Sequence, residues 1–175
     1  MLAISIIIIV ILGLSIATVI DIKQRRIPNW LTVSMTVVGL INSGVVKGWF
    51  GLGEHLLAMF FGLLLFFIFY LMGVFGAGDA KMMAALGAVM GFPLILYNSI
   101  SIILVGGLVS FIQLVRKDGL KRVMYLIYFF MKSLFTGKLK EFNHLVKNTS
   151  NNTFPFSIAI IVGSVITLWY MYPSY

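Results

Sequence analysis

Residues 2–20 read LAISIIIIVILGLSIATVI, a stretch without a single charged side chain. At about 1.5 Å of rise per residue, a helix of this length crosses the apolar part of a bilayer. The stretch lacks the basic start and the small-residue cleavage site of a secretory signal, so it is interpreted as a permanent membrane helix. Composition agrees, because 61% of the 175 residues are hydrophobic and only 10% are charged, against about 25% charged in soluble domains. We therefore predict an all-α, polytopic membrane protein.

The other apolar segments predict further spans. The 34 residues from Met82 to Val115 carry no charge, which is too long for one crossing. Pro93, Asn98 and Ser99 are taken to divide them, because proline interrupts a helix and short polar side chains favour turns. A glycine-punctuated turn at residues 47–53 separates two earlier spans. Six spans result, and those after the first cover residues 30–46, 56–75, 82–97, 100–115 and 154–172.

Three segments between the last spans are not expected to cross. Residues 116–122 are strongly basic and are predicted to form a loop. Residues 123–135 are apolar but too short to cross, so we expect a cytoplasmic interfacial helix whose Lys132 reaches the headgroups. Residues 136–153 are polar and basic, which favours a solvent-exposed loop. We expect one domain over residues 1–175.

The basic residues indicate how the spans are oriented. Lys and Arg are enriched in cytoplasmic loops. Placing both termini outside the cell puts every basic cluster on the cytoplasmic side and leaves only Lys47 on the other. These clusters lie at residues 23–26, 81, 116–122 and 132–147. The net charge of +8 is therefore assigned to contact with anionic lipid in the cell membrane, not to nucleic acid.

Residue types that bind metals or form disulfides are scarce. The sequence contains no cysteine, which excludes disulfides, thiolate zinc sites and a cysteine nucleophile. Its two histidines, His55 and His144, lie far apart in unrelated contexts. Both are interpreted as interfacial residues, not as ligands. No metal and no cofactor is predicted.

Two of the five acidic residues lie where a charge is costly. Asp21 directly follows the first apolar stretch, and Asp79 lies in the glycine-rich break Gly76-Ala77-Gly78-Asp79-Ala80-Lys81 between two apolar segments. An ionisable residue at membrane depth is by default a functional-site hypothesis. Both fall at the cytoplasmic end of the predicted bundle, although 58 positions separate them. The other acids belong to polar loops or span edges: Glu54, Asp118 and Glu141.

A pair of carboxyl groups in such a place suits acid–base chemistry. Two carboxylates that approach closely cannot both ionise readily, so one pKa rises and the pair shares a proton. One group can then activate a water while the other protonates a departing amide nitrogen, as in aspartic proteases. Gly76 and Gly78 would let a substrate backbone approach without a Cβ in the way. No cofactor is needed for this chemistry.

The residues alone leave two other interpretations open. Asp21, beside Lys23, could belong to an interfacial charge cluster, while Asp79 could pair with Lys81 and stabilise a loop. Alternatively, a proton-coupled transporter could use the same acid pair to carry protons. Composition and spacing do not separate these alternatives from a protease.

The two aspartate segments resemble those of a known family. The segment Gly76-Ala77-Gly78-Asp79-Ala80-Lys81 resembles the GxGD-x-K motif of type IV prepilin peptidases, and Met82-Met83-Ala84-Ala85-Leu86-Gly87-Ala88 is similar to its usual continuation. Upstream, Asp21 precedes Ile27-Pro28-Asn29, which resembles the first aspartate segment of that family. The resemblance covers the chain from the first span to about residue 115. The last third is similar only in topology.

This resemblance implies a six-helix membrane aspartic endopeptidase with a glycine-rich GxGD loop. Such an enzyme removes a short basic leader, at the cytoplasmic face, from pilin-like or preflagellin-like precursors that have an apolar N-terminal helix. Asp21 and Asp79 carry over as the catalytic pair, and Gly76, Gly78 and Lys81 as the active-site loop. The family's long members carry a cysteine-bearing insertion, and many also methylate the mature product. Because this sequence has neither cysteine nor insertion, we expect cleavage without methyl transfer. The rival functions are a transporter and a scaffold subunit of a secretion apparatus.

Overall fold

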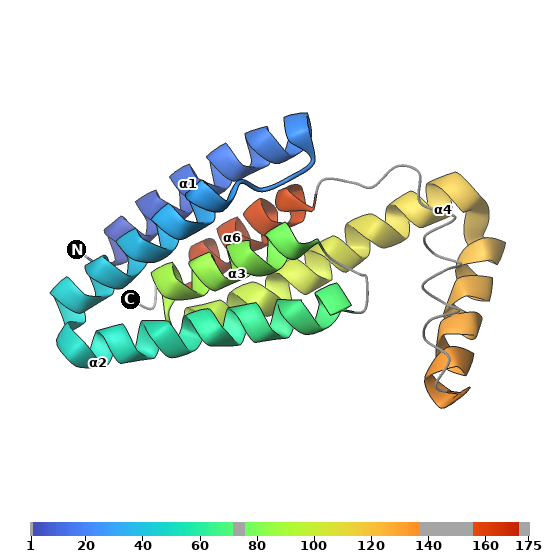
Figure 1. Cartoon of the computed structure of the whole chain (residues 1–175). Coiled ribbons are helices and arrows are strands. Elements are labelled where there is room, and N and C mark those ends of the chain that lie inside the picture. Colours follow the sequence, from blue (N-terminus) through green and yellow to red (C-terminus); the bar gives the residue numbers. More distant parts are fainter. Residues whose placement is uncertain (1, 72–75, 137–155, 172–175) are drawn as a thin grey trace. The chain divides into compact units, whose positions relative to one another are not determined.

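The computed structural model describes residues 2–71, 76–136 and 156–171, and every regular element in these ranges is an α-helix (Figure 1). This confirms the predicted all-α class. The chain divides into two compact units, one formed by Met1–Gly106 with Pro155–Tyr175 and the other by Gly107–Phe154. A single domain over residues 1–175 stays a prediction. The helices are α1 (Leu2–Gln24), α2 (Asn29–Leu71), α3 (Ala77–Met90), α4 (Leu94–Thr136) and α6 (Ser157–Met171).

Three helices in the described ranges are long and apolar enough to cross a membrane. They include residues Ile4–Gln24 of α1, all of α2, and Leu94–Ile112 of α4, whereas α6 is a shorter apolar helix. These helices support the prediction that the chain is a membrane protein. Six crossings, and the side on which each end lies, stay predictions.

Helix α2 consists of two arms joined by a sharp bend. Its one residue with non-helical dihedrals is Gly48, at φ 65° and ψ −156°, a combination that essentially only glycine adopts. The bend falls inside the turn predicted at residues 47–53, and the residues around Gly48 are helical. Lys47 Nζ and Glu54 Oε2 lie 3.1 Å apart across it. The two predicted spans on either side of this turn are thus the two arms of α2.

Helix α3 packs against both arms of α2 (Figure 1). Contacts with the first arm run from Lys81–Asn29 to Val89–Gly39, so that arm is parallel to α3. Contacts with the second arm run from Met83–Gly62 to Gly87–Ala58, so that arm is antiparallel to α3. Nearly all of α3 from Met82 to Met90 is consequently buried. This helix is the centre of the first unit.

The turn between α3 and α4 differs from the prediction. Gly91, at φ 67°, ends α3, and α4 begins at Leu94 immediately after Pro93. Asn98 and Ser99, predicted to mark the division, lie inside α4, where the Ser99 hydroxyl donates to the Ile95 carbonyl at 2.7 Å. A serine that bonds back within its own helix does not need a turn. The boundary predicted between the spans 82–97 and 100–115 is therefore wrong. The two helices meet at residues 91–93 instead.

The basic segment after the predicted span is also helical. Helix α4 continues through residues 116–122 and 123–135 to Thr136, so the predicted loop at 116–122 is wrong. Lys, Arg and Leu are good helix formers, and one glycine costs only about 1 kcal/mol inside a helix. The second unit begins at Gly107, within α4. The polar segment predicted at 136–153, with Glu141 and His144, lies outside the described residues apart from its first residue.

Candidate functional site

Asp21 lies in the last turn of α1. The helix extends four residues beyond the predicted span, to Gln24, so Asp21 is helical and its side chain is buried. The Arg25 N–H donates to the Asp21 carbonyl at 2.7 Å. Arg25 itself adopts a left-handed conformation, with φ 53°, which a non-glycine residue seldom does. This residue ends α1 and directs the chain toward the start of α2.

The segment between α1 and α2 lies against the start of α3. Ile27 is buried and faces Gly78, where a Cβ would lie 3.3 Å from the Ile27 Cβ and 3.5 Å from its nitrogen. Two residues later, Asn29 accepts a hydrogen bond from the Lys81 ammonium at 2.9 Å. The structure thus brings together the two aspartate segments, which are about 50 residues apart in the sequence.

Asp79 lies in the first turn of α3. Gly76 has extended backbone at φ −80° and ψ 155° and caps the helix. Its N–H donates to Asp79 Oδ2 at 2.9 Å, while the Asp79 N–H donates to the Gly76 carbonyl at 3.1 Å. From Ala77 onward the residues predicted to form a glycine-rich loop are therefore the first turn of a helix. A carboxylate in this position satisfies an N–H that would otherwise lack a helical partner.

The surroundings of Asp79 favour its protonated form. Burial raises the pKa of its carboxyl group to about 6, the hydrogen bond from the Gly76 N–H opposes this rise, and the negative charge of Asp21 adds to it. Charges influence each other in this way only when they are close. Asp21 and Asp79 are therefore electrostatically coupled, and Asp79 is the member whose pKa is raised.

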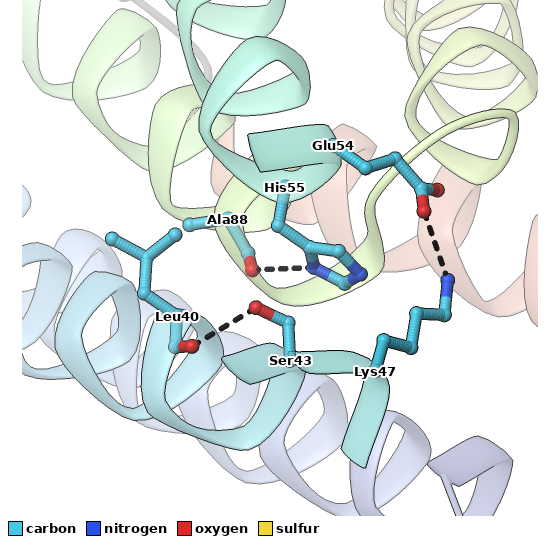
Figure 2. Close-up of polar contacts among 6 residues, drawn as sticks. All are labelled: Leu40, Ser43, Lys47, Glu54, His55 and Ala88. Atoms are coloured by element: carbon cyan, nitrogen blue, oxygen red, sulfur yellow. Dashed lines mark hydrogen bonds and ion pairs between the residues drawn. The ribbon is translucent and has the colours of Figure 1, made fainter. Parts of the chain in front are cut away.

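A second polar cluster lies at the other end of α3 (Figure 2). His55 is 1% exposed, and its Nδ1–H donates to the Ala88 carbonyl at 2.9 Å. Nearby, the Ser43 hydroxyl donates to the Leu40 carbonyl at 2.9 Å, and Lys47 pairs with Glu54. The interpretation of His55 as an interfacial residue is wrong, because the bend in α2 turns its side chain onto α3. His55, Ala58, Gly62 and Phe66 follow one another at intervals of three or four residues, which places them on one face of the helix. All four are buried, and this spacing could have predicted the burial of His55.

In the described part of the chain, no group of three His, Cys, Asp or Glu side chains could hold a metal ion. Lys81 belongs to the predicted loop, but its ammonium contacts Asn29. In the sequence, Asn29 stands out only as the last residue of the segment Ile27-Pro28-Asn29, and no role was predicted for it.

Comparison with known proteins links this chain to one family. The model of the type IV leader peptidase family matches residues 8–111. A preflagellin peptidase of Methanococcus voltae is 34% identical over 143 residues, which cover 75% of this chain and 60% of that relative. The chain thus spans about three fifths of the relative's length. No solved structure matches the chain. Both Asp21 and Asp79 lie inside the range that the family model matches.

Proposed function

The chain belongs to the type IV leader peptidase family, and from this we propose that it is a membrane-embedded aspartic endopeptidase that removes the leader peptide from pilin-like or preflagellin-like precursors. The observation that carries the proposal is the coupled pair of Asp21, in the last turn of α1, and Asp79, in the first turn of α3, which both lie inside the matched range. Hydrolysis of a peptide bond calls for an acid and a base, and such a pair supplies both without a cofactor.

The two aspartates take different roles in this mechanism. Because the pKa of Asp79 is raised to about 6, we assign Asp79 as the acid and Asp21 as the base. Asp21 accepts a proton from a water molecule as the water oxygen attacks the scissile carbonyl carbon. Asp79 donates its proton to the carbonyl oxygen, giving a neutral tetrahedral diol. The carbon–nitrogen bond then breaks, the amine leaves with a proton from Asp21, and Asp79 recovers the proton of a diol hydroxyl.

The basic residues near the pair suggest the orientation of the substrate. Lys23, Arg25 and Arg26 adjoin Asp21, and Lys81 adjoins Asp79. Since such clusters favour the cytoplasmic face, we place the active site there, in the cell membrane. The scissile bond would follow a basic leader and precede an apolar helix that stays in the bilayer. Anionic lipid would neutralise the basic segments of the enzyme during this encounter.

Cleavage is proposed to occur without methyl transfer. The sequence contains no cysteine, and it lacks the cysteine-bearing insertion of the bifunctional enzymes that it resembles. Mass spectrometry of the mature product decides the question. A gain of one methyl group that depends on this protein and on S-adenosylmethionine would contradict the proposal.

The direct test is cleavage of a precursor by the purified protein in lipid vesicles. The precursor carries a basic leader, a small residue and then an apolar segment, and cleavage is read as a mobility shift and by mass spectrometry. We expect a single cut before the apolar segment, insensitivity to chelators, and loss of activity in the Asp21→Asn and Asp79→Asn variants. Proton transport into the vesicles without any cleavage would instead support the transporter.

A further inference from the structure

One hydrogen bond joins the two aspartate segments side chain to side chain. The Lys81 ammonium donates to Asn29 Oδ1 at 2.9 Å, linking the first residue of α2 to the fifth residue of α3. Both side chains are exposed. The bond therefore does not serve to satisfy a buried polar group.

The hydrogen bond that Lys81 makes is not with a carboxylate, although Asp79 is only two residues away in the sequence. Its ammonium is directed to a neutral amide oxygen on another helix. Such an arrangement suits a mechanical link between two segments better than the stabilisation of a charge.

The segment held by this link leads directly to Asp21. From Asn29 the chain returns through Ile27, which lies against Gly78, and Arg25, whose N–H bonds the Asp21 carbonyl. Helix α1 itself packs mainly on α6 and α2, and less on α3. The separation of Asp21 and Asp79 therefore depends largely on how residues 25–29 lie across the start of α3.

We propose that Asn29 is a positioning residue, which holds Lys81 and thereby sets the separation of Asp21 and Asp79. This inference rests on the proposed function, because it assigns a role within that same site. Displacement of one catalytic group by about 1 Å can lower a rate by as much as a hundredfold. A solvent-exposed link contributes less, so we expect its loss to lower kcat about tenfold, or about 1.4 kcal/mol. KM should change less than twofold, because neither side chain is proposed to bind substrate.

The first experiment measures kcat and KM of five variants on the precursor described above. Asn29→Leu and Lys81→Met should each lose about tenfold in kcat, and the double variant should lose no more than either, since the two act as one unit. Asn29→Asp keeps the acceptor oxygen and should retain kcat within about threefold. Lys47→Met removes the same charge at the bend of α2, where Lys47 pairs with Glu54, and should change kcat less than twofold.

A covalent link provides a test that does not depend on charge. The chain has no cysteine, so Asn29→Cys with Lys81→Cys introduces the only thiol pair. We expect this variant to lose about tenfold in kcat and to recover most of it after treatment with a neutral bifunctional thiol reagent about as long as a lysine side chain. The single-cysteine variants should gain nothing from the reagent. Comparing one preparation before and after treatment removes any difference in folding yield.

Three outcomes would overturn the inference. They are wild-type kcat in Asn29→Leu, a double variant that loses the product of the two single losses, or no recovery on cross-linking. A loss in Lys81→Met alone, without recovery, would show that the charge of Lys81 matters. The proposed function is judged separately by Asp21→Asn and Asp79→Asn. If these two are inactive while Asn29→Leu is fully active, the protease stands and only the positioning role fails.

Discussion

The two ends of α3 have opposite characters. At its N-terminal end, Gly76 and Lys81 are exposed, Asp79 is partly buried, and the Lys81 ammonium bonds the side chain of Asn29 on α2. At its C-terminal end every residue from Ala85 to Gly91 is buried, and His55 bonds the backbone at Ala88 (Figure 2). The helix is thus fixed firmly at one end and presents polar groups at the other.

This difference indicates how the helix combines stability with access. Backbones approach closely at the buried end, where a Cβ on Gly87 would clash with the Ala58 carbonyl oxygen. Close packing of this kind resists displacement. The aspartate end can then remain partly open, because it does not have to hold the helix in place. Substitutions should therefore affect activity at one end and stability at the other.

The largest effect is expected at the aspartate end. Asp21→Asn and Asp79→Asn should each lower kcat by about a thousandfold or more, since general acid and base catalysis contribute up to about 10⁴-fold. The double variant should be no worse. Thermal unfolding should show no loss of stability, because Asn keeps the shape of Asp and carries no charge.

The matched control for these variants is Asp118→Asn, in the second unit, which should retain activity within about twofold. Cleavage rates on a precursor in vesicles provide the measurement. Appreciable turnover by either active-site variant, in a preparation free of wild-type protein, would remove the basis for the aspartic mechanism.

At the buried end, Gly91→Ala should lower the free energy of unfolding by about 2–4 kcal/mol. Gly91 has φ 67° and ψ −174°, and an added Cβ would lie 2.6 Å from His55 Nε2. Backbone strain of this kind costs about 1–3 kcal/mol, and overpacking adds to it. Gly53→Ala, which meets nothing within 4 Å, is the control and should be neutral or slightly stabilising. Equal stability of the two variants, measured by thermal unfolding in detergent, would show that this end is not the anchor.

The pH dependence should reflect Asp79 alone. Its folded-state pKa is raised above the ordinary value of 3.8 to about 6, so the carboxyl is protonated below pH 6 and ionised above it. If protonated Asp79 is the acid, kcat/KM should fall about tenfold per pH unit above pH 6. Initial rates between pH 5 and 8 test this, with circular dichroism confirming that the protein stays folded. A flat profile up to pH 8 would assign the acid to another group.

The smallest effect is expected at the bend of α2. Lys47 and Glu54 form an ion pair at 3.1 Å, but both side chains are about a third exposed. Such pairs contribute about 0–1 kcal/mol. Lys47→Met and Glu54→Gln should therefore each shift the unfolding free energy by less than about 1 kcal/mol and leave kcat unchanged. A larger loss would mean that the bend depends on this pair and not on Gly48.

Local signals in the sequence were sufficient for part of the fold. The uncharged stretch at residues 2–20 predicted α1, and the glycines at 47–53 predicted the bend that Gly48 makes. The glycine-rich break around Asp79 marked the start of α3. Gly76 caps this helix, which begins at the next residue, Ala77. These features depend on residues that are near each other in the chain.

Other features depend on contacts that the sequence does not show. Asparagine and serine are common in turns, but Asn98 and Ser99 lie inside α4. The turn between α3 and α4 comes earlier, at Gly91 and Pro93. The charge of residues 116–122 predicted a loop, although charge does not prevent a helix. The contact of Lys81 with Asn29 arises only when α2 and α3 pack side by side. The catalytic roles of Asp21 and Asp79 stay predictions.

The hydrogen bond from the Gly76 N–H distinguishes the two oxygens of one carboxyl group. Oδ2 of Asp79 accepts that bond at 2.9 Å, so an acidic hydrogen on Oδ2 would compete with the donor for the same oxygen. The neutral carboxyl therefore carries its hydrogen on Oδ1. The group is also restrained from rotating about its Cβ–Cγ bond, because rotation would break the bond to Gly76. In the proposed protease, the same oxygen, Oδ1, would thus be the proton donor in each catalytic cycle.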